Sequence, residues 1–200
     1  MSLVLPGGSV AETFFPVLAR AALDWTMVDV FWGDERAVPP GDLDSNYRLA
    51  DELLLRRVAI DQSRVHRMLA DAEDLDASAR SYETEIQRVL GEPPRFDIVL
   101  LGVGPDGHVC SLFPGHPALS TTSRRVLAII DSPKPPPRRL TLTLPVFDGA
   151  EIYIAAFGAA KSVVIREALR TPGSRLPVAR AARLGRSAVF LLDDEAGKLL

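Results

Sequence analysis

The chain has 200 residues, of which 47% are hydrophobic and 24% are charged, and its formal net charge is −3. This length suits one globular domain with a substantial core, and the single cysteine, Cys110, excludes a disulfide framework within the chain. No apolar run is long enough to cross a membrane, the first residues lack the features of a signal peptide, and the acidic balance argues against a general nucleic-acid binder. We therefore expect a cytoplasmic protein with no membrane or nucleic-acid partner.

Short apolar runs alternate along the chain with longer segments of helical periodicity. The apolar runs predict strands over residues 2–8, 27–32, 64–69, 96–104, 126–131, 151–158 and 187–194. The periodic segments predict helices over residues 10–23, 45–58, 75–91 and 159–170. Ser9, with Glu12 three residues later, predicts a capping box at the start of the first helix. This alternation is typical of an α/β fold with a mostly parallel, Rossmann-like sheet flanked by helices.

Four polar turns follow predicted strands, at residues 7–9, 33–36, 102–108 and 158–161. Ligands of parallel α/β sheets bind at the carboxyl ends of the strands. Because all four turns lie at that edge, the sequence predicts a pocket there.

Two of these turns carry groups suited to an anion. In "PGGS", glycine backbone N–H groups and a helix N-terminus suit a phosphate, although an ordinary tight turn capped by Ser9 has the same pattern. In "WGDERAVP", Arg36 can clamp an oxyanion and Asp34 can orient it or handle a proton. A solvated, self-paired charged loop is the alternative for this second turn.

The turn "GVGPDGH" carries the strongest chemical signal. His108 is its only side chain that exchanges a proton near neutral pH without a large pKa shift, and Asp106 can fix the His108 tautomer if the turn folds back. The glycines, Gly104 among them, permit unusual backbone angles and expose N–H groups. The alternative is a histidine that caps a helix, with Asp106 as the N-cap.

Other cations and histidines have plainer interpretations. Arg138, Arg139 and Lys161 can neutralise a phosphate, although single basic residues more often only face solvent. We interpret His66 and His116 as structural or solvent-facing. Because the three histidines lack the spacing of a zinc site, we predict no metal.

Four segments of the chain, in order and with matching gaps, resemble the 6-phosphogluconolactonase family of the glucosamine-6-phosphate isomerase superfamily. They are "LPGGSVAETFFPVL", "VFWGDERAVPPGDLDSNYRLADELLL", "FDIVLLGVGPDGHVCSLFPG" and "RRLTLTLPVFDGAEIYIAAFGAAK". The resemblance runs from about Leu3 to the end of the chain. It implies the glucosamine-6-phosphate deaminase-like fold and hydrolysis of 6-phospho-D-glucono-1,5-lactone to 6-phosphogluconate in the oxidative pentose phosphate pathway. It implies no metal or cofactor.

The resemblance also implies roles for individual residues. His108 would be the catalytic histidine, Gly8, Ser9, Arg139 and Lys161 would surround the phosphate, and Arg36 would lie near the lactone or the phosphate. Together with the chemistry of the turns, the predicted catalytic residues are His108, Asp106, Arg36 and Asp34. The predicted substrate-binding residues are Gly7, Gly8, Ser9, Gly104, Arg139 and Lys161.

The chain departs from the family pattern in two places. The family usually has a helix before the GGS strand, so we expect one domain over residues 1–200 from which this helix is missing. Val109 and Cys110 stand where the family often has Thr and Ala, and we expect Cys110 to pack rather than act as a nucleophile.

Two alternative functions stay open at the level of sequence. One is an amino-sugar-phosphate isomerase or deaminase, although that relative has Asp-Glu-Tyr where this chain has Asp34, Glu35 and Arg36. The other is a non-catalytic sugar-phosphate sensor on the same scaffold. The expected partner is a small sugar-phosphate lactone, and the expected assembly is a monomer or a small homo-oligomer.

Overall fold

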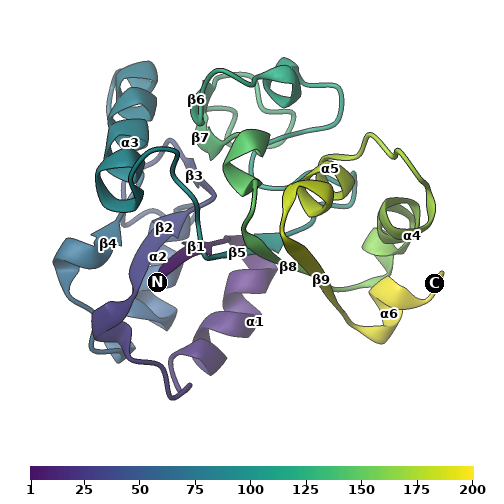
Figure 1. Ribbon diagram of the computed structural model, residues 1–200, viewed down its shortest axis with the longest axis horizontal. Helices are drawn as coiled ribbons and strands as arrows, with labels where there is room; N and C mark the ends of the chain where they lie inside the picture. Colours follow the sequence, from purple (N-terminus) through teal and green to yellow (C-terminus); the bar gives the residue numbers. More distant parts are fainter.

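A six-stranded sheet forms the centre of the fold, and all of its strand pairs are parallel. The computed structural model describes residues 1–200 and gives the strand order β4-β2-β1-β5-β8-β9 (Figure 1). The strands are β1 (Ser2–Leu5), β2 (Asp29–Trp32), β4 (Val65–His66), β5 (Ile98–Gly102), β8 (Glu151–Ala156) and β9 (Ser187–Leu192). Each lies within a predicted apolar run, so the predicted α/β class with a mostly parallel sheet is confirmed.

A second, three-stranded sheet is antiparallel and was not predicted. It has the order β3-β7-β6 and consists of β3 (Asp34–Arg36), β7 (Arg139–Leu142) and β6 (Val126–Ile129). The predicted strand at 126–131 is therefore real but lies outside the parallel sheet. Because β3 consists of three charged residues, its sequence has no strand pattern, and its pairing with β7 is what makes it a strand.

The helices are α1 (Gly8–Leu18), α2 (Asn46–Leu53), α3 (Leu75–Leu90), α4 (Ser162–Arg170), α5 (Pro177–Leu184) and α6 (Asp194–Gly197). The predicted capping box at Ser9 is wrong: Gly7 is the N-cap of α1, no side chain caps the helix, and Ser9 lies in its first turn. α2 ends at Leu53, five residues early, and a short 3-10 turn at Leu55–Arg57 follows it. α5 was not predicted.

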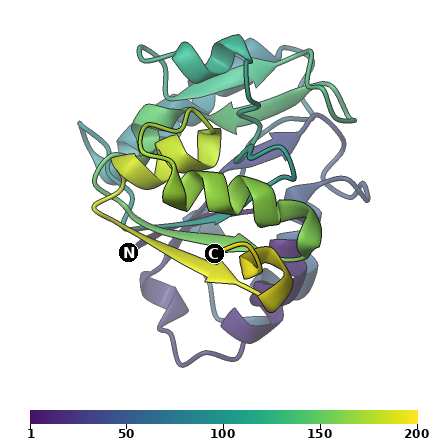
Figure 2. The same ribbon diagram turned by 90° about the vertical axis from the view of Figure 1, so that its right-hand side faces the viewer.

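Different helices and strands pack on the two faces of the parallel sheet (Figure 2). α1 lies on one face, where Val10 packs with Leu100 of β5 and Ala155 of β8 in a small apolar cluster. α4, α5 and the antiparallel sheet lie on the other side of the parallel sheet. The main core cluster holds 43 buried residues, and its members come from both sheets. The antiparallel sheet therefore belongs to the same packed body.

The strand order reverses at the centre of the parallel sheet. From β1 the chain moves to β2 and then β4 on one side, whereas β5, β8 and β9 follow on the other side. In open α/β sheets such a switch point leaves a crevice at the carboxyl ends of the two central strands, where ligands bind. The segments after β1 and β5 are the predicted turns at residues 7–9 and 102–108.

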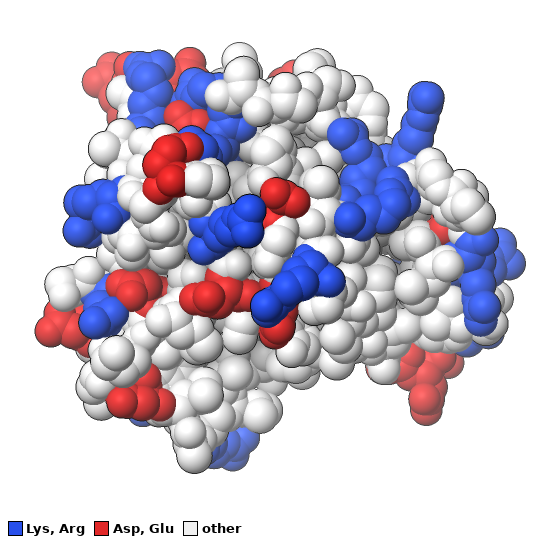
Figure 3. All heavy atoms as spheres, in the orientation of Figure 1, with Lys and Arg blue, Asp and Glu red and all other residues white.

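On the face drawn in Figure 3, basic and acidic side chains are interspersed toward the left, whereas basic side chains predominate toward the right, over α4 and α5. No helix has both the length and the apolar character that crossing a membrane requires.

Candidate functional site

An open cavity lies at the switch point and contains about 660 Å³ of empty space. Its walls come from the ends of β1 and β5, from the start of α1, from β3 and from the turn before α4. The predicted site residues that line it are Gly7, Gly8, Ser9, Asp34, Arg36, Gly104, His108, Arg139 and Lys161. The fold thus brings together nine of the ten predicted site residues, and the tenth, Asp106, contacts His108 from outside the cavity wall.

The loop after β5 is folded tightly on itself and holds His108. The Gly104 N–H donates to the His108 carbonyl at 2.9 Å, and the Gly107 N–H donates to the Gly104 carbonyl at 2.9 Å. A Cβ atom on Gly104 would lie 2.0 Å from the His108 ring, so only glycine fits beneath this ring. Gly107 has a φ of 82°, which also favours glycine. The glycines therefore shape the loop, and these two N–H groups are used within it.

Asp106 orients the His108 ring, as the sequence suggested for a turn that folds back. Asp106 Oδ1 lies 2.5 Å from His108 Nδ1, and no hydrogen bond occupies Nε2. Burial lowers the pKa of His108, while the hydrogen bond and charge of Asp106 act against this shift. The Phe113 ring packs 4.6 Å from the imidazole. The result is a half-buried imidazole that tends to stay neutral and has a free Nε2.

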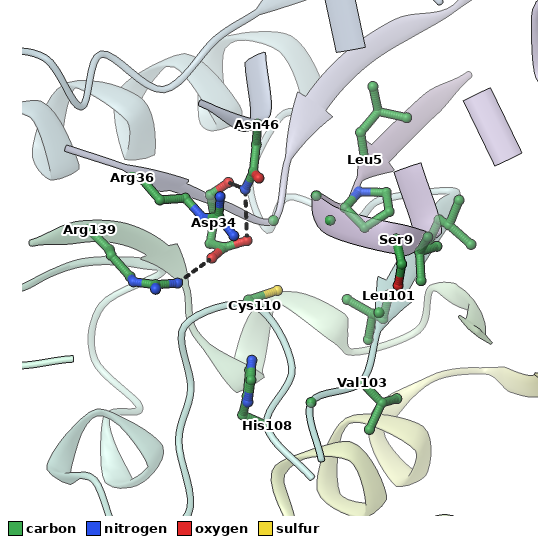
Figure 4. A pocket seen from close by; sticks show the side chains of 18 of the residues that line it. Leu5, Ser9, Asp34, Arg36, Asn46, Leu101, Val103, His108, Cys110 and Arg139 are labelled. Atoms are coloured by element: carbon green, nitrogen blue, oxygen red, sulfur yellow. Dashed lines mark hydrogen bonds and ion pairs between the residues drawn. The ribbon is translucent and has the colours of Figure 1, made fainter. Parts of the chain in front are cut away.

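Asp34 lies at the centre of a buried polar cluster on the opposite wall (Figure 4). Ser111 Oγ donates to its carboxylate at 2.7 Å, Asn46 Nδ2 donates to it at 3.3 Å, and Arg139 Nη1 lies 3.8 Å away. In Figure 4 the His108 ring points toward Cys110 and the Asp34 side of the cavity. Asp34 is thus a fixed, hydrogen-bonded carboxylate at the cavity wall.

Glu35, the middle residue of this charged turn, caps α2. Its carboxylate accepts hydrogen bonds from the backbone N–H groups of Arg36, Asn46 and Tyr47, and from Ser45 Oγ. Burial raises the pKa of Glu35, and these backbone hydrogen bonds offset part of that shift. Glu35 therefore ties the start of α2 to β3 and places Asn46 in the cavity wall.

Arg36 is held by the loop before α2 through a single side-chain hydrogen bond, and its other N–H donors have no partner within the protein. Its Nη1 donates to the Asp44 carbonyl at 2.6 Å, whereas its buried Nε has no hydrogen-bond partner. The predicted self-paired charged loop is therefore not what forms, because Asp34 and Glu35 bond to other groups.

Lys161 lines the same cavity as the N-terminal turn of α1. It is half-buried, and no carboxylate lies within 4.0 Å of its ammonium group. Burial lowers the pKa of Lys161, and the charge of Asp193 acts against this shift. Gly8, with a φ of 61°, and Ser9 form the first turn of α1 and also line this cavity. A lysine without an acidic partner and a helix N-terminus together favour an anion.

Arg139 lines the cavity but is largely committed to the protein. Its Nε donates to the Pro136 carbonyl at 3.0 Å, its Nη2 donates to the Lys134 and Pro135 carbonyls at 3.1 and 2.9 Å, and its Nη1 donates to Ser111 Oγ at 3.3 Å. One N–H of the guanidinium is left for a ligand or for Asp34. Arg138, by contrast, is exposed and donates to the Glu73 carbonyl.

The Cys110 thiol and the His66 and His116 imidazoles have surroundings that suit a structural role. Cys110 lies at the cavity wall, and burial raises the pKa of its thiol well above the ordinary value. The buried His66 ring lies between Glu85 at 2.7 Å and Asp29 at 3.0 Å. His116 Nε2 lies 3.0 Å from Asp131, and His116 Nδ1 accepts from the Ala118 N–H at 3.2 Å.

Sequence reasoning missed three polar residues of this region, namely Asn46, Ser111 and Lys134. Asn46 and Ser111 gave no signal because each reaches Asp34 from a segment more than ten residues away. Lys134 lies 3.4 Å from Asp106 Oδ1, but a lysine among prolines looks like an ordinary loop. Only the tertiary fold brings these residues to the site.

The sequence matches a family model described as glucosamine-6-phosphate isomerases/6-phosphogluconolactonase over residues 1–190. A 6-phosphogluconolactonase of Streptomyces coelicolor is 39% identical, and the match covers 100% of this chain and 82% of that protein. A 6-phosphogluconolactonase of Mycobacterium tuberculosis is 41% identical, with 98% and 84% coverage.

Solved structures agree in fold. The 6-phosphogluconolactonase of Trypanosoma brucei is 32% identical with a TM-score of 0.86, covering 100% of this chain and 86% of that one. A monomeric glucosamine-6-phosphate deaminase has a TM-score of 0.82 at 23% identity, with 100% and 88% coverage, which shows the shared fold alone. By sequence and by structure, this chain belongs to the family of glucosamine-6-phosphate isomerases and 6-phosphogluconolactonases.

Proposed function

We propose that this chain hydrolyses 6-phospho-D-glucono-1,5-lactone to 6-phosphogluconate, with His108 as the general base. The single observation that carries this role is the His108 ring, whose Nδ1 is held by Asp106 at 2.5 Å while Nε2 is free beside the cavity. The activity itself is supported by homology, because the relatives that match nearly the whole chain are 6-phosphogluconolactonases.

In the proposed reaction His108 Nε2 accepts a proton from water while the water oxygen attacks the lactone carbonyl carbon. The tetrahedral intermediate collapses with cleavage of the bond between that carbon and the ring oxygen, and His108 returns the proton to the departing ring oxygen. Asp106 keeps the proton of the neutral ring on Nδ1, so that Nε2 is the basic nitrogen. A positioned general base of this kind contributes about 10²–10⁴-fold to a rate.

The carbonyl oxygen gains negative charge as water attacks, and a donor must face it. We assign this role to Arg36, which lines the cavity and whose guanidinium has only one hydrogen bond within the protein, from Nη1 to the Asp44 carbonyl. Backbone donors of the 102–107 loop are weaker candidates than the sequence suggested, because the Gly104 and Gly107 N–H groups are bonded within the loop. One preorganised donor to such an oxyanion contributes about 3–4 kcal/mol.

The phosphate end of the substrate is assigned to the opposite side of the cavity. Gly8, Ser9 and the start of α1 offer backbone donors, and Lys161 offers a charge without an acidic partner. Because the phosphate is remote from the reacting carbon, its binding energy orients the lactone toward His108.

The activity is tested by measuring lactone hydrolysis and ammonia release with the same purified protein. We expect 6-phosphogluconolactone to disappear faster than the spontaneous rate, and glucosamine 6-phosphate to release no ammonia. Ammonia release without lactone hydrolysis would assign the deaminase reaction instead. Binding of 6-phosphogluconate with no turnover of either compound would indicate the sensor.

A further inference from the structure

The proline-rich loop between β6 and β7 brings a lysine to the His108–Asp106 pair. Lys134 Nζ lies 3.4 Å from Asp106 Oδ1 and 3.4 Å from His108 Nδ1. The same carboxylate oxygen is also hydrogen-bonded to the His108 ring, at 2.5 Å from Nδ1. One oxygen of Asp106 is therefore shared between an imidazole and an ammonium group.

The backbone of this loop is held independently of the lysine side chain. Arg139 donates to the carbonyl groups of Lys134, Pro135 and Pro136, as described above. Ser132 Oγ donates to the Lys134 carbonyl at 2.8 Å and accepts from its N–H at 3.2 Å. Because these contacts use only backbone atoms of Lys134, the lysine side chain can be replaced while the loop stays in place.

We propose that Lys134 is a positioning residue for the reaction: its ammonium group holds the Asp106 carboxylate against the His108 ring and keeps this ring uncharged near neutral pH. The proposal deepens the proposed function, because it assigns a reason for the protonation state of the base. Lys134 itself does not line the cavity, so we assign it no contact with substrate.

Three charged side chains act on His108 in addition to its burial. Asp106 from the same loop and Asp34 from β3 both favour the charged imidazolium, and Lys134 is the cation that opposes them. Burial of the ring is the largest influence that lowers the pKa of His108, and Lys134 adds to it. Phe113 contributes an apolar ring on one side. Arg139 lies beside Asp34, so without Lys134 the His108–Asp106 pair alone would lack a neighbouring cation.

Lys134 also affects the partner of the histidine. Burial alone would raise the pKa of Asp106, but the hydrogen bond from His108 and the charge of Lys134 lower it overall. A charged Asp106 accepts the Nδ1 proton, which leaves the lone pair on Nε2. The lysine therefore stabilises both halves of the arrangement, an ionised aspartate and a neutral histidine.

The test is an NMR titration of the three imidazole rings in the whole protein, with the His108 signal identified by its loss in His108→Asn. We expect Lys134→Met to move the His108 midpoint upward by roughly 0.5–1 pH unit. Lys134→Arg should restore most of the original midpoint because the charge returns. Arg138→Gln is the matched control, since it removes one exposed cation from the same loop and should leave the midpoint unchanged.

An unchanged His108 midpoint in Lys134→Met, or an equal shift in Arg138→Gln, would overturn the proposal. Turnover measured on the same proteins separates this outcome from a failure of the proposed function. If the midpoint moves and the acid limb of kcat moves with it, both ideas are supported. If the midpoint moves while the acid limb stays, Lys134 acts as proposed but His108 is not the base.

Discussion

At the scale of single residues, the cavity separates two kinds of chemistry. His108 and Asp106 lie on the loop after β5, whereas Lys161 precedes α4 and lines the cavity together with the turn after β1. We propose that the first pair handles protons and that Lys161, which has no carboxylate within 4.0 Å, binds the phosphate. Substitutions at the two places should therefore affect different steps.

We expect Lys161→Ala to weaken binding of 6-phosphogluconate by about 10- to 100-fold, because a hydrogen bond to a charged group contributes about 1.5–3 kcal/mol. Binding of unphosphorylated gluconate should change little. Lys198→Ala is the control, since Lys198 is exposed and pairs with Glu195. Isothermal titration calorimetry measures both ligands on the unmodified chain and on the two variants, and an equal loss for both ligands in Lys161→Ala would show that Lys161 is structural.

Arg139→Ala is a less selective probe of the phosphate site than the sequence suggested. Four N–H groups of Arg139 hydrogen-bond to the proline-rich loop between β6 and β7 and to Ser111. The substitution therefore also removes a hydrogen bond that holds the backbone of Lys134. A change in ligand affinity in that variant therefore mixes phosphate binding with movement of the loop.

The pH dependence of turnover follows from the environment of His108. Because burial lowers its pKa from the ordinary value of 6.5, the neutral, active form persists below that pH. We expect kcat, corrected at every pH for spontaneous hydrolysis, to fall only as the pH drops below 6.5. An acid limb above 6.5 would contradict the lowered pKa of His108, whereas a rate that does not fall at low pH would contradict its role as a neutral base.

At the scale of elements, the site depends on close contact between the starts of α1 and α2. Gly7, the N-cap of α1, lies against Asn46, the first residue of α2, which is 1% exposed. A Cβ atom on Gly7 would lie 1.8 Å from Asn46 Oδ1. Glu35 holds the start of α2 in this position, because its carboxylate accepts the backbone N–H groups of Asn46 and Tyr47.

We expect Gly7→Ala to destabilise the protein by about 1–3 kcal/mol, because the added methyl group displaces the buried Asn46 side chain from its hydrogen bonds to Asp34. Activity should fall as well, since Asn46 bonds to Asp34. Gly41→Ala is the matched control, because no atom lies within 4 Å of its added Cβ. Denaturant unfolding monitored by circular dichroism gives both values, and equal stability of the two variants would refute the contact.

A buried tyrosine links α3 to the parallel sheet. Tyr82 Oη accepts the Trp32 N–H at 2.9 Å and donates to the His66 carbonyl at 3.0 Å, which joins α3 to β2 and β4. Tyr82→Phe leaves the buried Trp32 N–H without this acceptor and should cost about 1–3 kcal/mol of unfolding free energy. Tyr153→Phe, at a partly exposed position, should cost less than half as much in the same unfolding assay.

At the scale of the whole molecule, the sequence predicted the parallel sheet well because its central strands, β1 and β5, are largely buried on both faces. The run at Ile98–Gly102 is a clear example, since its apolar residues are continuous. The antiparallel sheet was missed because β3 is made of charged residues whose partners lie about 100 positions away in the chain. The start of α1 was misplaced because Gly7, Gly8 and Ser9 can each begin a helix, and close packing against Asn46 selects Gly7.

The candidate site was predicted in outline for a related reason. Parallel strands bring their carboxyl ends to one edge, so turns far apart in sequence meet there. Which groups neutralise one another inside the site depends on exact placement. The commitment of Arg139 to backbone carbonyls and the approach of Lys134 to Asp106 are therefore visible only in the folded chain.

We propose that His108 is the base of a lactone hydrolase, and turnover of a His108 variant tests this role. His108→Ala should lower kcat for 6-phosphogluconolactone by about 10²–10⁴-fold, measured by NMR above the spontaneous background, with unchanged unfolding temperature and 6-phosphogluconate affinity. A His108→Ala protein that folds, binds 6-phosphogluconate and keeps kcat near that of the unmodified chain would contradict the claim and make Asp34 the next candidate base.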